Sequence, residues 1–306
     1  MMPTGYVHPD YAAAFGDFGE PLSLPKCQGW LLKRTIPGTD HHDAMGCYPL
    51  FSCRDWAHLP QDLTDRAADL VSVSLVLDPF GEWELSGLHA FFDRVVRFKE
   101  HFVVDLSVPL DSFVPKHHRY YARKALRELK VERCENPSSR VEEWTSLYSI
   151  LVKRHQLTGI KAFSMQSFAR QLAVPGLVMF RALKDDHCLG AHLWYIQGDV
   201  AYSHLLALSE AGYAMNASYA LYSEALRFFG SSSADHIHWA QIGAGAGSSG
   251  TATDGLTQFK RGWSNAMRPT YFCGKVMDSF RYEDLCRLAG VSATAYFPAY
   301  REGELG

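Results

Sequence analysis

The stretch that decides the fold reads GLVMFRALK (176–184), CLGAHLWYIQ (188–197) and VAYSHLLALS (200–209). All three segments have the length of strands and are rich in β-branched, aromatic and large apolar residues. The linkers between them, KDDH and GD, have the composition of hairpin turns. We therefore expect three antiparallel strands in a row.

A helix and a fourth strand follow these hairpins. Apolar residues recur every fourth position over 216–229, which predicts a helix that ends at Gly230. HIHWAQ (236–241) then has the pattern of a strand. The strand at 200–209, the helix and the strand at 236–241 form a βαβ unit, so the two strands should be parallel neighbours.

The first half of the chain carries weaker signals of the same mixed type. Helices are expected over 84–98 and from 117 onward, and strands over 29–36, 68–78 and 101–108. The run Asn136-Pro137-Ser138-Ser139 breaks the pattern. We therefore expect an α+β protein with a mixed sheet and two modules, residues 1–135 and 136–306.

The βαβ unit indicates where a ligand would bind. In such sheets, ligands bind beyond the carboxyl ends of the strands, next to the N-terminus of the following helix. Residues 206–209 and 240–243 form that end of the predicted sheet. The backbone N–H groups of Asn216, Ala217 and Ser218 can hold a phosphate or a carbonyl oxygen there. The simpler alternative is that Asn216 only caps the helix.

Histidines lie on both strands of the predicted parallel pair. His204 is on the first strand and His238 on the second, and histidine is the natural base near neutral pH. Both are equally compatible with hydrogen-bonded histidines inside a sheet. His236 and His238 share one face, so a zinc site with His204 is geometrically conceivable. No carboxylate is evidently placed to complete such a site, and no metal is expected.

Three short motifs occur in a fixed order between residues 115 and 276. An R-x-x-x-R-K-A run at 119–125 comes first, then the hairpin LGAHLWYIQGDVAYSHLLAL (189–208), and last a G-L-x-x-F-K-x-G-W run at 255–263. This order resembles the FemAB/CelD-like branch of the GNAT (N-acyltransferase) superfamily, which typically carries the R-x-x-x-R-K-A helix in mid-chain and an F-K pair late in the chain. The F-K pair here is Phe259-Lys260.

The resemblance implies tandem GNAT-like modules, of which the first is degenerate. It implies transfer of an acyl or aminoacyl group from acyl-CoA or aminoacyl-tRNA to an amine or hydroxyl, often on cell-envelope precursors. Arg119, Arg123 and Lys124 would then bind the substrate, and Phe259 and Lys260 would contact the donor. The alternative for the basic residues at 119–127 is a solvated helix face.

Acyl transfer has chemical requirements that these residues can meet. An amine that attacks a thioester or ester builds an oxyanion, and the protein must stabilise this charge and remove a proton. Lys260 supplies a cation, and His204 or His238 a base. A thiolate leaving group needs little help, because a free thiol has a pKa of about 8.5. A ribose hydroxyl would need an acid, for which Tyr202 and Tyr219 are candidates.

The composition of the chain indicates which donor is used and in which cellular compartment the protein works. The 306 residues include 30 Lys and Arg against 33 Asp and Glu, a formal net charge of −3. This balance disfavours DNA as a partner and favours acyl-CoA over tRNA as the donor. No signal peptide, no membrane-spanning apolar run and no C-x-x-C pair among the seven cysteines is present in the sequence. We therefore expect a cytoplasmic protein.

The leading hypothesis is an acyltransferase that moves an acyl group from acyl-CoA to an amine of a cell-envelope glycan, sugar or peptide. An aminoacyl-tRNA-dependent transferase of peptidoglycan precursors is the alternative. Two other classes remain: a non-catalytic module that binds a glycan or a partner, and a metal-dependent hydrolase. The GAGAGSSG run (243–250) fails the context of a dinucleotide-binding loop and is predicted to be a lid.

Overall fold

The computed structural model describes residues 2–231, 234, 236–245, 255–291 and 294–304. The chain forms two compact units. Unit 1 comprises Met1–Asp10 and Lys99–Pro269, and unit 2 comprises Tyr11–Phe98 and Thr270–Gly306. The chain therefore passes from one unit to the other three times.

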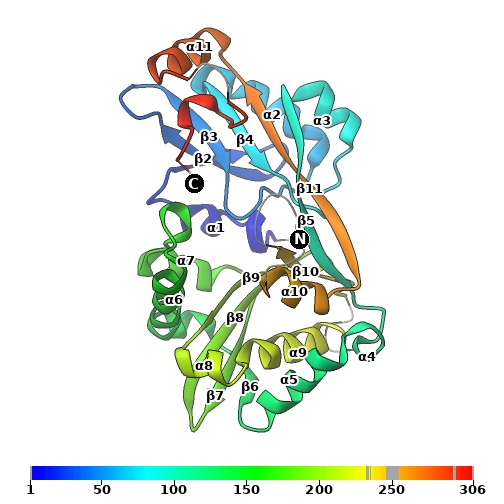
Figure 1. Ribbon diagram of the computed structural model, residues 1–306. Helices are drawn as coiled ribbons and strands as arrows, with labels where there is room; N and C mark the ends of the chain where they lie inside the picture. The colour runs from blue at the N-terminus through cyan, green and yellow to red at the C-terminus, as the bar shows by residue number, and fades with distance from the viewer. Residues whose placement is uncertain (1, 232–233, 235, 246–254, 292–293, 305–306) are drawn as a thin grey trace. The chain divides into compact units, whose positions relative to one another are not determined.

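Unit 1 is built on a six-stranded part of a mixed sheet, in the order β5-β10-β9-β8-β7-β6. Strands β9 and β10 are parallel, and the other neighbours are antiparallel. The three antiparallel strands in a row and their parallel neighbour are thus confirmed. The strands are β5 (Arg94–Asp105, which enters unit 1 at Lys99), β6 (Lys130–Arg133), β7 (Leu177–Lys184), β8 (His187–Gln197), β9 (Val200–Leu208) and β10 (Trp239–Ala244) (Figure 1).

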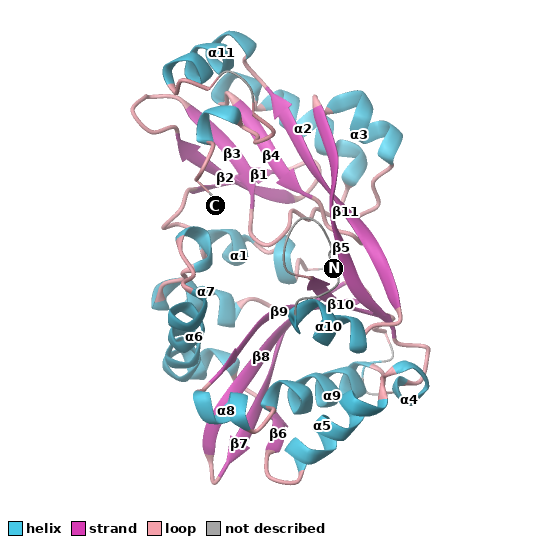
Figure 2. Cartoon of the chain, viewed as in Figure 1, coloured by secondary structure: helices cyan, strands magenta, loops and turns pink. Residues whose placement is uncertain are grey.

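Helices cover both faces of this sheet (Figure 2). Trp194 of β8 packs against Phe229 of α9, with ring centroids 5.1 Å apart. The next residue, Tyr195, donates a hydrogen bond to the carbonyl of Gln171 on α7 (2.8 Å). Since neighbouring side chains of a strand point to opposite faces, α9 and α7 lie on opposite faces. The helices of unit 1 are α4 (Leu110–Phe113), α5 (Lys116–Leu126), α6 (Val141–His155), α7 (Met165–Ala173), α8 (Glu210–Ala214), α9 (Ala217–Phe229) and α10 (Gly255–Gly262).

Unit 2 has its own part of the sheet and its own core. Its strand order is β1-β2-β3-β4-β11, in which β3 and β4 are parallel and the other neighbours antiparallel. Leu31, Phe51, Leu75 and Cys273 are among its buried residues. The elements are α1 (Pro9–Ala13, at the first crossing point), β1 (Glu20–Leu24), β2 (Gly29–Thr35), β3 (His42–Gly46), α2 (Leu59–Asp65), β4 (Ser72–Val76), α3 (Leu85–Phe91), β11 (Ala266–Val276, which enters unit 2 at Thr270) and α11 (Ser279–Leu288).

The structure differs from the sequence expectations in two places. The helix expected over 84–98 ends at Phe91, and β5 begins at Arg94, because Val95 and Val96 fit a strand as well as a helix. The compact units also do not follow a boundary at 135/136, since both sides of that position belong to unit 1. Within the part of the chain that the structure describes, no helix is both long and apolar enough to span a membrane.

Arg181 joins three elements of unit 1 near the surface of the sheet. Its guanidinium lies on β7 and bonds Glu143 of α6 through two nitrogens, at 2.8 and 2.6 Å. A third nitrogen bonds Glu132 of β6 at 2.6 Å. The Arg181 side chain is 7 % exposed, and the two carboxylates raise the pKa of its guanidinium further above its usual range. The arginine therefore neutralises two partly buried carboxylates at once.

Replacing Arg181 by Met should destabilise the protein markedly. The two carboxylates would then face each other without a counter-ion, and we expect the free energy of unfolding to fall by about 3 kcal/mol. Lys184→Met is the matched control, because Lys184 pairs with Glu128 at the surface, with side chains 40 % and 57 % exposed. We expect it to change the free energy by less than about 1 kcal/mol. Urea unfolding curves measure both, and equal effects would contradict the prediction.

Candidate active site

Strand β10 pairs with only the first three residues of β9, Val200 to Tyr202. Their register runs from Trp239 opposite Val200 to Gln241 opposite Tyr202, whereas β9 continues to Leu208. Beyond the Tyr202–Gln241 pair the two parallel strands part. We call this open end the fork; it is bounded by residues 203–208 of β9 and 243–244 of β10.

A β-bulge on each strand causes the fork. The register of β9 with β8 jumps from Ser203 to Leu205, so His204 is an extra residue. The register of β10 with β5 jumps from Gln241 to Gly243, so Ile242 is an extra residue there. Bulges bend a strand and end its pairing. Both bulges follow within two residues of the last shared pair, which places the opening at the carboxyl ends of the strands, as expected.

The N-terminus of α9 follows β9 after the short helix α8. Asn216 adopts the left-handed backbone conformation (φ 57°, ψ 36°), and its N–H donates to the carbonyl of Tyr213 at 3.1 Å. Asn216 therefore does not offer the unpaired N–H group expected from the sequence. Ala217 and Ser218 belong to the first turn of α9, where N–H groups lack acceptors within the helix. An anion-binding role for these two stays a prediction.

Lys260 brings a positive charge to the fork. Its ammonium group donates a hydrogen bond to the carbonyl of Ala244 at the end of β10 (2.8 Å). A Cβ atom added to Gly243, whose φ is +85°, would lie 2.8 Å from Lys260 Nζ. The positive φ favours glycine at 243, and the absence of a side chain there leaves room for the lysine ammonium group.

Two buried histidines lie near this charge. Burial, aided by the positive charges of Lys260 and Lys99, lowers the pKa of His101 to about 3. Burial and the charge of Lys260 lower the pKa of His192 well below its usual value. Both imidazoles are therefore neutral at physiological pH. Neither ring therefore carries a positive charge that would compete with Lys260 for an anion.

An aromatic cluster anchors the helix that carries Lys260. Phe259 packs between Tyr219 and Tyr222 of α9, with centroids 4.9 and 5.1 Å away. Its carbonyl accepts a hydrogen bond from Nε2 of His118 on α5 (3.0 Å). A Cβ atom at Gly262 would lie 2.2 Å from the ring of His118, so only glycine lets α10 approach α5 this closely. Phe259 packs against the core and helps to position Lys260, and its expected contact with the donor stays a prediction.

His204 and Tyr202 lie on the other face of the sheet from α9. His204 Nε2 donates to Gln171 Oε1 (2.9 Å), and Nδ1 accepts from the Tyr6 hydroxyl (3.3 Å). Tyr202 packs edge-on against the ring of Tyr6 and is 1 % exposed. Burial lowers the pKa of His204 to about 3. This environment favours a neutral structural histidine, and it does not support the expected roles of His204 as base and Tyr202 as acid.

The structure does not bring His204 and His238 together. His238 lies one residue before β10, and its backbone N–H donates to the carbonyl of Asp199 (2.8 Å). Asp199 lies one residue before the amino end of β9. His204 lies five residues farther along β9, about 16 Å away at 3.3 Å per residue. The pair therefore cannot share a proton, and no three-histidine zinc site with His236 forms. No group of three metal-binding side chains occurs among the described residues.

The basic residues of α5 form a partly tethered surface. Arg119 Nη1 donates to the carbonyl of Asp111 (3.3 Å) and lies 3.7 Å from its carboxylate. Arg123 and Lys124 are exposed. Arg123 donates from Nε to the carbonyl of Arg119 (3.2 Å), so the two guanidinium groups follow one side of the helix. These residues can meet phosphates, while Arg119 also holds the segment before α5.

Three residues near the fork were not identified from the sequence: Ser203, His192 and His118. Ser203 Oγ lies 2.8 Å from His192 Nε2 and 3.3 Å from the hydroxyl of Tyr222. The bulge at His204 decides which of the adjacent residues faces α9, and no local pattern predicts that bulge. The segment 246–254, which holds most of the predicted lid, lies outside the described residues.

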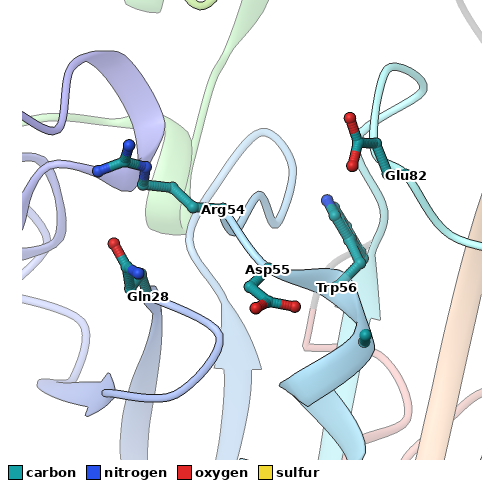
Figure 3. A pocket seen from close by; sticks show the side chains of 6 residues that line it. Gln28, Arg54, Asp55, Trp56 and Glu82 are labelled. Carbon is teal, nitrogen blue, oxygen red and sulfur yellow. The ribbon is translucent and has the colours of Figure 1, made fainter. Parts of the chain in front are cut away.

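Unit 2 has an open pocket of about 490 Å³, apart from the fork. Arg54 and Gln28 lie on one side of it, and Asp55, Trp56 and Glu82 lie on the other (Figure 3). Its walls carry charges of both signs, and Asp55 already pairs with His58 at 2.8 Å. The pocket shares no residue with the fork and adds nothing to the acyl-transfer chemistry expected there.

Comparison with known proteins identifies the fold. A scan against protein-family models finds no match, and a search of curated protein sequences finds none either. Among solved structures, the chain is similar to the C-terminal domain of a protein described as a lysylphosphatidylglycerol synthetase from Agrobacterium fabrum, with a TM-score of 0.63 and 14 % identity over 88 % of this chain and 89 % of that one. FemX gives a TM-score of 0.63 with 12 % identity over 90 % and 92 %.

The L-PGS protein from Bacillus licheniformis is similar over 96 % of this chain and 100 % of its own, with a TM-score of 0.60 and 12 % identity. These likenesses cover both compact units rather than the residues of one motif. The chain therefore shares its fold with FemX and with these two proteins, as the resemblance in the sequence predicts.

Burial of His204 should make the protein less stable in weak acid. The unfolded chain protonates this histidine near pH 6.5, whereas the folded chain protonates it near pH 3. Stability is therefore full above pH 6.5 and is lost as the pH falls, by about 1.4 kcal/mol per unit for one such histidine. Between pH 6.5 and 5, His204→Gln should remove about 2 kcal/mol of the loss seen in the wild type.

Urea unfolding of wild type and variant at pH 7, 6.5, 6 and 5 measures this difference. His238→Gln is the control, because His238 is exposed, and it should keep the wild-type slope. A wild-type slope in His204→Gln as well would show that His204 is not held neutral.

Proposed function

We propose that this chain is an acyltransferase, and that it moves an acyl group from acyl-CoA to an amine of a cell-envelope glycan, sugar or peptide. The observation that carries the proposal is the ammonium group of Lys260 at the fork, beside Gly243 and Ala244. The fold shared with FemX, with L-PGS and with the protein described as a lysylphosphatidylglycerol synthetase supports the same class of reaction.

The fork suits the chemistry of this reaction. The amine nitrogen attacks the thioester carbonyl, a C–N bond forms, and the carbonyl oxygen becomes negative. Lys260 stabilises that charge where few other charges compete, because His101 and His192 stay neutral. The C–S bond then breaks, and the amine proton passes through water to the departing thiolate. The products are an amide and free CoA thiol, with atoms and charge in balance.

The phosphates of the donor have two matching partners in unit 1. The first-turn N–H groups of Ala217 and Ser218 lie at the N-terminus of α9, where the helix dipole favours an anion. Arg123 and Lys124 extend an exposed positive surface along α5, which packs on α9. We assign the acyl carbonyl to the fork and the phosphates to this surface. Since acyl-CoA is made inside cells, the proposal places the reaction in the cytoplasm.

The basic residues of α5 and of its C-cap also favour a second candidate, an aminoacyl-tRNA donor. Arg119, Arg123, Lys124 and Arg127 lie within two and a half turns, a spacing that can follow a phosphate backbone. Net charge argues the other way, because the whole chain carries −3. Acyl-CoA therefore stays the leading donor, and the two donors are separated by direct binding.

Lys260→Ala should abolish most of the activity while leaving the fold intact. Loss of a cation from an oxyanion site lowers kcat by about 100- to 1000-fold, and Lys260→Arg should recover part of it. Release of CoA thiol from a panel of acyl-CoAs with amine acceptors measures the rates. Arg261→Ala, an exposed cation on the same helix, should change kcat by less than threefold. An unchanged rate in Lys260→Ala would show that Lys260 does not stabilise the oxyanion, whereas absence of turnover by the wild type with every acyl-CoA would favour a non-catalytic module.

The double variant Arg123→Ala/Lys124→Ala should weaken donor binding without affecting the fork. Two lost phosphate contacts are expected to raise the Kd for acetyl-CoA about tenfold, since 1.4 kcal/mol is tenfold in affinity. Titration calorimetry measures this value, and filter binding measures tRNA in parallel at several salt concentrations. Binding of aminoacyl-tRNA together with no binding of any acyl-CoA would replace the leading donor with the second candidate.

A further inference from the structure

Ser203, His192 and Tyr222 form a polar network inside the apolar core of unit 1. Ser203 Oγ is the central atom, 2.8 Å from His192 Nε2 and 3.3 Å from the Tyr222 hydroxyl. His192 is completely buried and Tyr222 is 3 % exposed, whereas Ser203 is half-buried. Ser203 is therefore the member of the network that a ligand can reach.

The network contains three donor hydrogens. His192 is neutral and carries one N–H group, because burial and Lys260 oppose its second proton. Burial raises the pKa of Tyr222 to about 12, so its hydroxyl keeps its hydrogen. The hydroxyl of Ser203 is the third donor. Only two contacts join the three groups, so one hydrogen must point elsewhere.

The position of the histidine N–H group follows from its second nitrogen. His192 Nδ1 is buried and has no hydrogen-bond partner among the described residues. A buried N–H without an acceptor is rare in folded proteins, and an unfilled acceptor is tolerated more often. The hydrogen therefore belongs on Nε2, which donates it to Ser203 Oγ.

The remaining hydrogen then belongs to Ser203. The contact between Ser203 and Tyr222 uses one of the two hydroxyl hydrogens, and the other has no acceptor within the network. On Tyr222 this hydrogen would be buried without a partner, whereas Ser203 is half-buried and its hydrogen can meet solvent or a ligand. Ser203 Oγ thus accepts from both His192 and Tyr222, and its own hydrogen is free for a ligand.

The place of Ser203 in the sheet identifies that ligand. It is the first residue of the fork, directly after the last pair between β9 and β10. Lys260 acts on the same region, since its charge reaches His192. We propose that the Ser203 hydroxyl donates a hydrogen bond to the carbonyl oxygen of the acyl group, and that His192 is a positioning residue that holds this hydroxyl. The inference rests on the proposed acyl transfer and adds a second oxyanion donor to Lys260.

The same geometry argues against a covalent acyl-serine intermediate. A nucleophilic Ser203 would have to give its proton to His192, whose Nε2 already carries a hydrogen. A second proton would make an imidazolium, which the buried site and Lys260 both disfavour. The amine is therefore expected to attack the donor directly, with no bond formed to Ser203.

Steady-state kinetics of Ser203→Ala test the role of the hydroxyl. A donor that acts mainly in the transition state contributes to kcat more than to binding, so we expect kcat to fall about 100-fold while the Kd for acyl-CoA changes less than twofold. Ser203→Thr keeps the hydroxyl and should recover at least tenfold of that loss. Ser231→Ala, which removes a hydroxyl that bonds the carbonyl of Phe228, is the matched control and should keep the wild-type rate.

Two variants of His192 separate positioning from simple packing. Gln places an amide N–H near the position of Nε2 and should keep kcat within about fivefold, whereas Met fills the space without a donor and should lose as much as Ser203→Ala. Thermal unfolding of each variant shows whether it folds. If Ser203→Ala does not fold, Ser203→Cys takes its place, with a smaller expected loss of about tenfold because a thiol is a weaker donor.

The outcomes divide cleanly. A folded Ser203→Ala protein with wild-type kcat, or with kcat and donor affinity lost in equal measure, overturns the inference. An acyl adduct on Ser203, sought by intact-mass spectrometry of the wild type with acyl-CoA alone, overturns it as well. If the wild-type protein neither binds nor turns over any acyl-CoA or aminoacyl-tRNA, the proposed acyl transfer itself is wrong. This result differs from an active wild type whose kcat does not depend on Ser203, which overturns only the inference on Ser203.

Discussion

The parting of β9 and β10 after the Tyr202–Gln241 pair is the constraint on which the rest of the candidate site depends. Two parallel strands that stayed paired would satisfy each other's N–H and C=O groups and leave no place for a carbonyl group of a ligand. The bulges at His204 and Ile242 end the pairing on both strands within two residues. Local backbone geometry thus creates the site before any catalytic side chain is considered.

The electrostatics of the fork follow from burial. Water screens the charge of a fully exposed lysine, whereas Lys260 is half-buried at the end of β10, where its charge is screened less. Burial, aided by this charge, lowers the pKa of His101 and of His192, and the neutral rings do not compete with Lys260 for an anion. The aromatic cluster around Phe259 holds the lysine there, because the backbone of Phe259 is bonded to His118 and its ring is enclosed by α9. The position of the Lys260 charge therefore depends on the packing of the aromatic cluster around Phe259.

Much of the fold can be predicted from the sequence because its signals are local. The hairpins of 176–209 and the parallel neighbour at 236–241 follow from turn composition and from the handedness of βαβ units. Lys260 was identified through the F-K pair. The directions of the side chains could not be predicted, because the bulge at His204 depends on the neighbouring strands. This bulge places His204 against Tyr6 and turns Ser203 towards α9. His192 gave no signal, since its partner lies eleven residues away on the next strand.

The threading of the chain through the two units has a consequence for synthesis. In unit 2, β4 pairs with β11, whose residues follow about 200 positions later in the chain. At about 5–20 residues per second, a ribosome needs on the order of 10–40 s to deliver them. During that interval the hydrogen-bonding edge of β4 has no native partner, and an unpaired edge can recruit strands from other nascent chains. Chaperone binding to this edge during synthesis is therefore expected to raise the yield of folded protein.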